Sequence, residues 1–264
     1  MAKFVRQGRK VSGSKIPHAR VSAHAREWRA SHTHTHTHTH THTNTHTHTH
    51  TPCSVLTQVA AQVVAIGRNY KLHAEELQNP VPAEPFWFLK PPSAYVLPGS
   101  PIVIPDGVDS IHHEVELGVI ISRQCKNVSE RQAYDNVAGY CVALDMTARC
   151  WQDKAKKKGL PWTAAKGFDT SLPVGSFIPA SLVRDPMALT LWCRVNGEQR
   201  QRGTTADMLF SIPQLIARVS QIHTLEEGDL LLTGTPAGVG PVVSGDSIEI
   251  GIEELKTSAT FRVQ

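Results

Sequence analysis

The feature that most restricts the fold is a tract of alternating threonine and histidine from His32 to Thr51, which Asn44 alone interrupts. Strict alternation is typical of a β-strand, but neither face of this tract is apolar, so no hydrophobic free energy would drive its burial. Two interpretations stay open: a metal-binding histidine tract, or a translated dinucleotide repeat with no specific function. In either case the tract does not belong to a packed core.

The residues before and within this tract differ in composition from the rest of the chain. Residues 1–52 hold eight Lys and Arg side chains against the single acid Glu27, together with eleven of the 15 histidines. Residues 1–30 are rich in Arg, Ser and Ala, as transit peptides are, although Pro17 would interrupt a helix. We expect residues 1–52 to be a disordered low-complexity leader, either a targeting segment or a leader with no specific role. Residues 53–264 are expected to form the folded domain.

Charge, hydropathy and cysteine usage exclude several classes of protein. The whole chain has 264 residues and a formal net charge of +4, but residues 53–264 hold 19 basic and 22 acidic side chains, a net charge of −3. That balance argues against nucleic-acid binding. No apolar run approaches the ~18 residues that cross a bilayer, so an integral membrane protein is not expected. The five cysteines are widely spaced without a Cys-x-x-Cys pair, which favours a reducing compartment over a disulfide scaffold or a zinc site.

Residues 53–264 show the patterns of an α+β, β-rich fold with a few short helices. Strands are predicted at Glu114–Ile121, Tyr140–Leu144, Leu189–Val195, Glu198–Arg202 and Leu230–Thr233. Asn196-Gly197 predicts a tight hairpin turn. Ser211 and Gln214 match a helix capping box. Four lysines between residues 154 and 158 precede Gly159, which is typical of a solvated helix end rather than a nucleic-acid patch.

Three carboxylates give the strongest indication of a functional site in the sequence. Glu114 and Glu116 are two residues apart on a predicted strand, so they project from one face, where two like charges repel. Asp145 ends the apolar run Val142–Leu144, and a buried carboxylate there needs a partner. Oxygen ligands without cysteine favour a hard divalent ion, Mg²⁺ or Mn²⁺, over zinc. The alternative is a solvated strand face with a helix-capping Asp145.

Other polar residues give weaker indications. His73 and Glu76 stand at i and i+3, so a helix would let the carboxylate orient the imidazole as a general base; an ordinary surface pair is the alternative. Arg149 and Gln152 share that spacing, and Lys166 is flanked by small residues that leave room for a ligand. The alternatives are a surface salt bridge for the Arg149 pair and a turn lysine for Lys166. The glycine-rich segment 233–240 lacks the Lys-Ser/Thr of a phosphate-binding loop, so no nucleotide cofactor is expected.

Together these stretches resemble the fumarylacetoacetate hydrolase family. The matching motifs are Gly67-Arg68-Asn69-Tyr70, Phe88-Leu89-Lys90-Pro91, His113–Gly118, Leu144–Arg149, Lys166–Asp169, Val195–Glu198 and Leu232–Pro236. Their order and spacing cover roughly residues 56–262. The resemblance implies a homodimer of mixed β-rolls with a Mg²⁺ or Mn²⁺ ion and no nucleotide or organic cofactor.

The resemblance also implies a role for each matching residue. The implied metal ligands are Glu114, Glu116 and Asp145, the implied catalytic residues are His73, Glu76 and Lys166, and the implied substrate-binding residues are Arg149, Gln152 and Thr235. His73 and Glu76 would lie on a short lid helix. The leader, residues 1–52, has no counterpart in the family, so the resemblance says nothing about it.

The activity that the resemblance implies is hydrolysis of acylpyruvates to pyruvate and a carboxylate, with decarboxylation of oxaloacetate to pyruvate and CO₂ at the same site. Keto–enol tautomerisation of oxaloacetate is an alternative, and so is a catalytically silent binding protein with a His-rich arm. The expected partners are small 2-oxo acids, without nucleic acid or membrane. The resemblance implies the mitochondrion, with the cytosol as the alternative.

Overall fold

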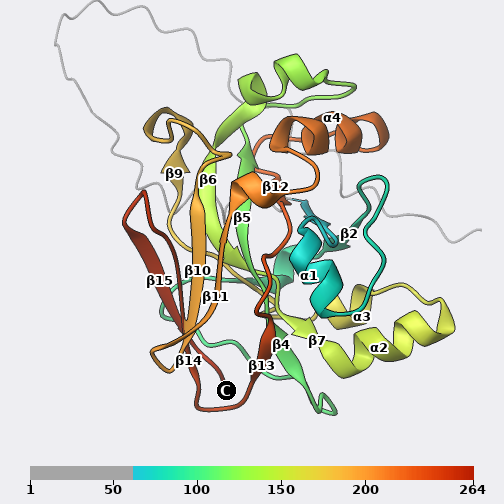
Figure 1. The fold of residues 1–264 in the computed structure, drawn as a ribbon, viewed down its shortest axis with the longest axis vertical. Coiled ribbons are helices and arrows are strands. Elements are labelled where there is room, and N and C mark those ends of the chain that lie inside the picture. The colour runs from blue at the N-terminus through green and yellow to red at the C-terminus, as the bar shows by residue number, and fades with distance from the viewer. Residues whose placement is uncertain (1–61) are drawn as a thin grey trace, which may run out of the picture. The chain divides into compact units, whose positions relative to one another are not determined.

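The computed structural model describes residues 62–264 (Figure 1). The leader predicted for residues 1–52 and the start of the predicted domain, residues 53–61, lie outside the described residues. Strands dominate the described chain, arranged in four sheets with a few short helices between them. This arrangement confirms the predicted α+β, β-rich fold.

A six-stranded sheet, ordered β2-β1-β12-β5-β6-β9, lies at the centre of the fold. Its strands are β1 (Val63–Ile66), β2 (Trp87–Lys90), β5 (Val115–Ile121), β6 (Val137–Leu144), β9 (Ile178–Pro179) and β12 (Leu230–Leu232). β1 and β12 are parallel, and the other neighbours are antiparallel. Because β5 is paired on both sides and covered on both faces, every residue of the strand is buried. The alternative of a solvated strand face is therefore wrong.

A second, four-stranded antiparallel sheet is ordered β11-β10-β14-β15. Its strands are β10 (Thr190–Val195), β11 (Glu198–Thr204), β14 (Ser247–Ile252) and β15 (Thr257–Arg262). The predicted hairpin joins β10 and β11, and Asn196 and Gly197 adopt φ values of 53° and 82° that a tight turn of this kind requires. Leu191 of β10 and Leu117 of β5 belong to the same hydrophobic cluster, so the two sheets share one core.

The remaining strands form two small sheets at the edges of the core. A three-stranded sheet holds β13 (Gly240–Val242), β4 (Ile111–His113) and β7 (Thr147–Ala148), and a parallel pair holds β3 (Tyr95–Val96) and β8 (Leu172–Pro173). Short 3₁₀ helices occupy Pro92–Ala94, Glu130–Gln132, Tyr134–Asn136, Ala180–Leu182 and Thr205–Asp207. These two strands border the site: β4 ends directly before Glu114, and β7 begins shortly after Asp145.

The α-helices are α1 (Lys71–Glu76), α2 (Arg149–Lys158), α3 (Thr163–Lys166) and α4 (Ile212–Ile222). α2 and α3 contact each other and β7 (Figure 1). α2 ends at Gly159 in the left-handed conformation, with three lysines in its last turn, which confirms the predicted helix end. The backbone N–H of Ser211 donates to Gln214 Oε1 over 2.9 Å, which confirms the capping box of α4. None of the helices in residues 62–264 is long and apolar enough to span a bilayer.

Candidate active site

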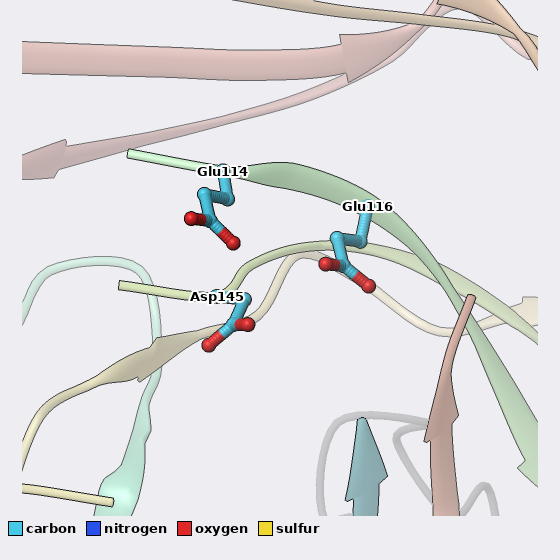
Figure 2. Close-up of side chains that lie close together, drawn as sticks. All are labelled: Glu114, Glu116 and Asp145. Carbon is cyan, nitrogen blue, oxygen red and sulfur yellow. The ribbon is translucent and has the colours of Figure 1, made fainter. Parts of the chain in front are cut away.

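Glu114, Glu116 and Asp145 converge at one end of β5, where they lie close together (Figure 2). The antiparallel register of β5 and β6 sets Val115 opposite Leu144, so the residues that precede one strand and follow the other become neighbours. The backbone N–H of Asp145 donates to the carbonyl oxygen of Glu114 over 2.8 Å. One carboxylate oxygen from each side chain lies within 4.8 Å of the others.

This carboxylate cluster has the composition and charge of a site for a hard divalent cation. The three residues are only 4%, 1% and 1% exposed in sequence order, which excludes a solvated strand face. Burial, together with the charges of Asp145 and Glu114, raises the pKa of Glu116 well above its ordinary value. A hydrogen bond of 2.6 Å from the backbone N–H of Gly234 to Glu116 Oε2 opposes that shift only in part. Three oxygen donors held this close fit Mg²⁺ or Mn²⁺.

Two predicted residues, Lys166 and Arg149, border the cluster. Lys166 Nζ lies 2.5 Å from Asp145 Oδ2 and 2.8 Å from Glu114 Oε2, and Arg149 forms an ion pair with Glu114. Burial opposes ionisation of Glu114, but Lys166 and Arg149 outweigh it and hold the pKa of this carboxyl below its ordinary value. Lys166 and Arg149 are both buried, so the interpretations of a turn lysine and a surface pair are wrong.

Lys90, to which the sequence patterns assign no role, is a third basic residue at the cluster. Its Nζ lies 2.8 Å from Asp145 Oδ1 and donates to the carbonyl oxygens of Lys166 and, over 2.9 Å, Ser171. One buried ammonium therefore holds both a candidate ligand and the end of the helix that carries Lys166. A lysine directly after the apolar run Phe86–Leu89 was the available signal, because a buried charge needs partners.

Gln201 on β11 is a second residue that sequence reasoning missed. Its Oε1 accepts a hydrogen bond of 3.0 Å from the backbone N–H of Val115 and lies 2.9 Å from His113 Nδ1. Its Nε2 donates to the Thr235 hydroxyl and to the Pro236 carbonyl oxygen, each over 2.8 Å. Gln201 thus connects Val115, the residue between the two glutamates, to the loop that carries Thr235. Nothing in the polar sequence around it marks it as buried.

His73 and Glu76 come together on α1 as their spacing predicts. Nδ1 of His73 lies 3.6 Å from Oε2 of Glu76, and the Glu76 carboxylate accepts from the backbone N–H of Gly238 over 3.0 and 3.2 Å. Burial lowers the pKa of His73, and the charges of Glu114 and Glu76 only partly offset this effect. A lowered pKa favours the neutral imidazole, which is the form that can accept a proton.

One cavity unites these residues. Every predicted site residue except Glu76 lines it, and Arg68, Phe88, Lys156 and Trp162 are among its other walls. Arg149 donates from Nη1 to Gln152 Oε1 over 2.5 Å, so this i,i+3 pair also forms. Phe88 and Trp162 continue into a neighbouring groove of about 900 Å³ lined mainly by aromatic residues, prolines and leucines. The cavity therefore combines a charged floor with an aromatic edge.

Comparisons with known proteins agree on one family. Residues 62–263 match the profile described as fumarylacetoacetate (FAA) hydrolase C-terminal. The chain is 52% identical over 213 residues to mitochondrial oxaloacetate tautomerase FAHD1 of Homo sapiens, which covers 81% of this chain and 96% of the relative. It is 49% identical over 207 residues to mitochondrial oxaloacetate decarboxylase of Dictyostelium discoideum, which covers 78% and 95%. The fumarylpyruvate hydrolase of Pseudomonas aeruginosa, solved with Mn²⁺ and pyruvate, matches with a TM-score of 0.73 and 36% identity over 77% of this chain and 89% of that one.

Proposed function

The chain belongs to the fumarylacetoacetate hydrolase family, and from this membership we propose a divalent-metal-dependent enzyme that converts small 2-oxo acids through an enolate. The observation that carries the proposal is the buried cluster of Glu114, Glu116 and Asp145 with Lys166 against it. Relatives named for oxaloacetate tautomerisation and decarboxylation make oxaloacetate the proposed first substrate.

The carboxylate cluster would hold Mg²⁺ or Mn²⁺. A bound divalent cation supplies Lewis acidity at the keto and carboxylate oxygens of a 2-oxo acid. Arg149, Gln152 and Thr235 line the same cavity and would present N–H and O–H groups to the substrate. The relative solved with Mn²⁺ and pyruvate supports both the class of metal and the class of ligand.

Lys166 would stabilise the negative charge that develops on the keto oxygen of the substrate. In tautomerisation that charge appears as C3 loses a proton, and the His73 imidazole, which lines the cavity, would accept this proton. In decarboxylation C3 loses CO₂ instead of a proton, and the pyruvate enolate forms with its charge on the same keto oxygen, which needs no base. One site can therefore support both reactions of oxaloacetate.

Acylpyruvate hydrolysis is a second candidate, and the His73–Glu76 pair is the observation that favours it. Here His73 would remove a proton from water, and the hydroxide would add to the distal carbonyl carbon. Cleavage of the bond between that carbon and C3 then gives a carboxylic acid and the pyruvate enolate, which His73 protonates at C3. Glu76 would orient the imidazole through both steps.

We also propose a homodimer in the mitochondrion. The mitochondrial relatives favour that compartment over the cytosol, and the Arg-rich composition of residues 1–30 is in keeping with it. The rival function, a silent binding protein with a His-rich arm, is separated by deleting residues 1–52: an enzyme keeps its turnover, whereas a binder of this kind loses its partner.

The deciding experiment measures three reactions of the purified full chain. Decay of enol-oxaloacetate absorbance, pyruvate release from oxaloacetate and pyruvate release from acetylpyruvate are each followed with Mg²⁺, with Mn²⁺ and with chelator. We expect turnover with either metal and its loss with chelator. Turnover that is indifferent to chelator, or no turnover of any substrate above the uncatalysed rate, would remove the proposal.

A further inference from the structure

Arg68 lines the cavity but has no part in the chemistry above. Its φ of 55° lies in the left-handed region, which side-chain-bearing residues rarely adopt. The turn is held by its neighbours: Gly67 donates to the carbonyl oxygen of Phe86 over 3.0 Å, and Asn69 donates from Nδ2 to the carbonyl oxygen of Thr233 over 2.9 Å. The Arg68 side chain is thus projected at the cavity without being needed to hold the turn.

Two aromatic rings set the orientation of this guanidinium. Its central carbon lies 5.6 Å from the ring centre of Phe86 and 5.9 Å from that of Trp162. Cation–π contacts of this kind contribute about 0.5–1 kcal/mol each at exposed sites. A planar guanidinium that packs by its face still presents its N–H groups at the edge, in the fork geometry that matches a carboxylate.

Arg68 is also electrically uncompensated. Within residues 62–264 the ion pairs do not include it, and burial lowers its pKa without an acidic neighbour to oppose the shift. The other acids and bases of the site balance in number: Lys90, Lys166 and Arg149 pair with Asp145 and Glu114, and Glu116 is the third carboxylate of the cluster. Lys156, a further cation in the wall, has its own partner in Asp153 at 3.7 Å.

This charge balance indicates which charge the ligand should carry. A divalent cation at the carboxylate cluster would add two positive charges to a neutral set, and Arg68 adds a third at the cavity wall. A 2-oxo acid with one carboxylate neutralises one of these three charges, whereas a dicarboxylic 2-oxo acid neutralises two of them and has a second anionic group for Arg68. We propose that Arg68 binds the distal carboxylate of a dicarboxylic 2-oxo acid and so selects it over a 2-oxo acid with an uncharged distal group. The inference rests on the proposed function for the nature of the substrate.

The same contact would influence which reaction follows. Decarboxylation moves the negative charge of the distal carboxylate into the enolate as CO₂ departs, so a cation paired with that carboxylate stabilises the ground state more than the transition state. Tautomerisation leaves the charge on the carboxylate throughout. Arg68 therefore favours tautomerisation over decarboxylation of the bound dicarboxylate.

The test compares full-length wild type, Arg68→Gln, Arg68→Lys and Lys157→Met. Lys157 is an exposed lysine outside the cavity wall, so its variant controls for the loss of one positive charge. We expect Arg68→Gln to lower the ratio of kcat/KM for oxaloacetate to that for acetylpyruvate about tenfold, mainly through KM. The kcat of decarboxylation should fall less than the kcat of tautomerisation. Arg68→Lys should recover part of the ratio, and Lys157→Met should leave it as in wild type.

Binding without turnover is measured in parallel, by the Mn²⁺-dependent thermal shift with 2-oxoglutarate and with 2-oxopentanoate, which differ only in the distal carboxylate. Wild type should prefer the dicarboxylate, and Arg68→Gln should lose the preference. If wild type shows this preference and Arg68→Gln loses it, but wild type turns over no substrate, the proposed function fails and the role of Arg68 stands. Equal losses for both classes of 2-oxo acid in Arg68→Gln, or the same change in Lys157→Met, would overturn the inference.

Discussion

The side-chain amide of Gln201 donates a hydrogen bond of 2.8 Å to the hydroxyl of Thr235. The oxygen of the same amide accepts from the backbone N–H of Val115, the residue between the two glutamates of the carboxylate cluster. The positions of a candidate substrate-binding residue and of two candidate metal ligands therefore depend on one buried side chain. That dependence makes Gln201 a positioning residue for the site.

Replacing Gln201 by Met should cost about 1–3 kcal/mol in the free energy of unfolding, because buried partners of the amide are left without hydrogen bonds. It should also raise KM for oxaloacetate more than it lowers kcat, since Thr235 loses its support. Urea denaturation and steady-state kinetics measure the two effects. Gln199→Met, an exposed glutamine on the same strand, is the matched control and should change neither. A stable Gln201→Met variant with unchanged KM would contradict the assignment.

Glu116→Gln should have opposite effects with and without metal. In chelator it should raise the free energy of unfolding, because it removes a carboxyl group whose charged form is disfavoured by burial and by the charges of Asp145 and Glu114. Saturating Mn²⁺ at a hundred times its Kd should stabilise wild type by about 2.7 kcal/mol and the variant far less. Denaturation with Mn²⁺ and with chelator tests this, with the exposed Glu130→Gln as control. An equal Mn²⁺ effect in wild type and Glu116→Gln would exclude Glu116 as a ligand.

His73→Ala should reduce acetylpyruvate hydrolysis by about 10²–10⁴-fold, the usual contribution of a general base. Decarboxylation of oxaloacetate should lose much less, because CO₂ departs without activated water. Glu75→Ala is the control, since Glu75 lies on the same helix but pairs with the exposed Lys71 at 3.6 Å. Equal losses in both reactions would indicate that the His73–Glu76 pair acts on the common enolate instead.

The pH profile of hydrolysis should reflect the burial of His73. Burial lowers the pKa of this imidazole from its ordinary 6.5, and a lower pKa means that the base stays unprotonated as the pH falls through that value. The acid limb of kcat/KM for acetylpyruvate should therefore lie below pH 6.5. A half-maximal rate at or above that pH in wild type would show that a different group, or a less buried His73, controls the reaction.

Local patterns predicted much of the fold because each depends on neighbours in the chain. The β10–β11 hairpin follows from the turn preference of Asn196-Gly197. The approach of His73 to Glu76 follows from the pitch of a helix. The strand that carries Glu116 follows from alternation, although its burial on both faces depends on sheets that no single segment specifies.

By itself, the sequence determined the family, the β-rich fold class and the three carboxylates, since motif order, strand period and ligand type are local properties of the chain. Only the tertiary structure decided which distant groups meet. Lys90 at the end of β2 pairs with Asp145, which follows β6, and Gln201 contacts Val115 from 86 residues away. In the sequence, Arg68 does not differ from other loop arginines. In the fold it lies over two aromatic rings and has no acidic partner among the described residues. The physical reason is that burial and charge compensation are set by the whole fold. These two properties decide whether a polar residue is an ordinary surface residue or part of a site.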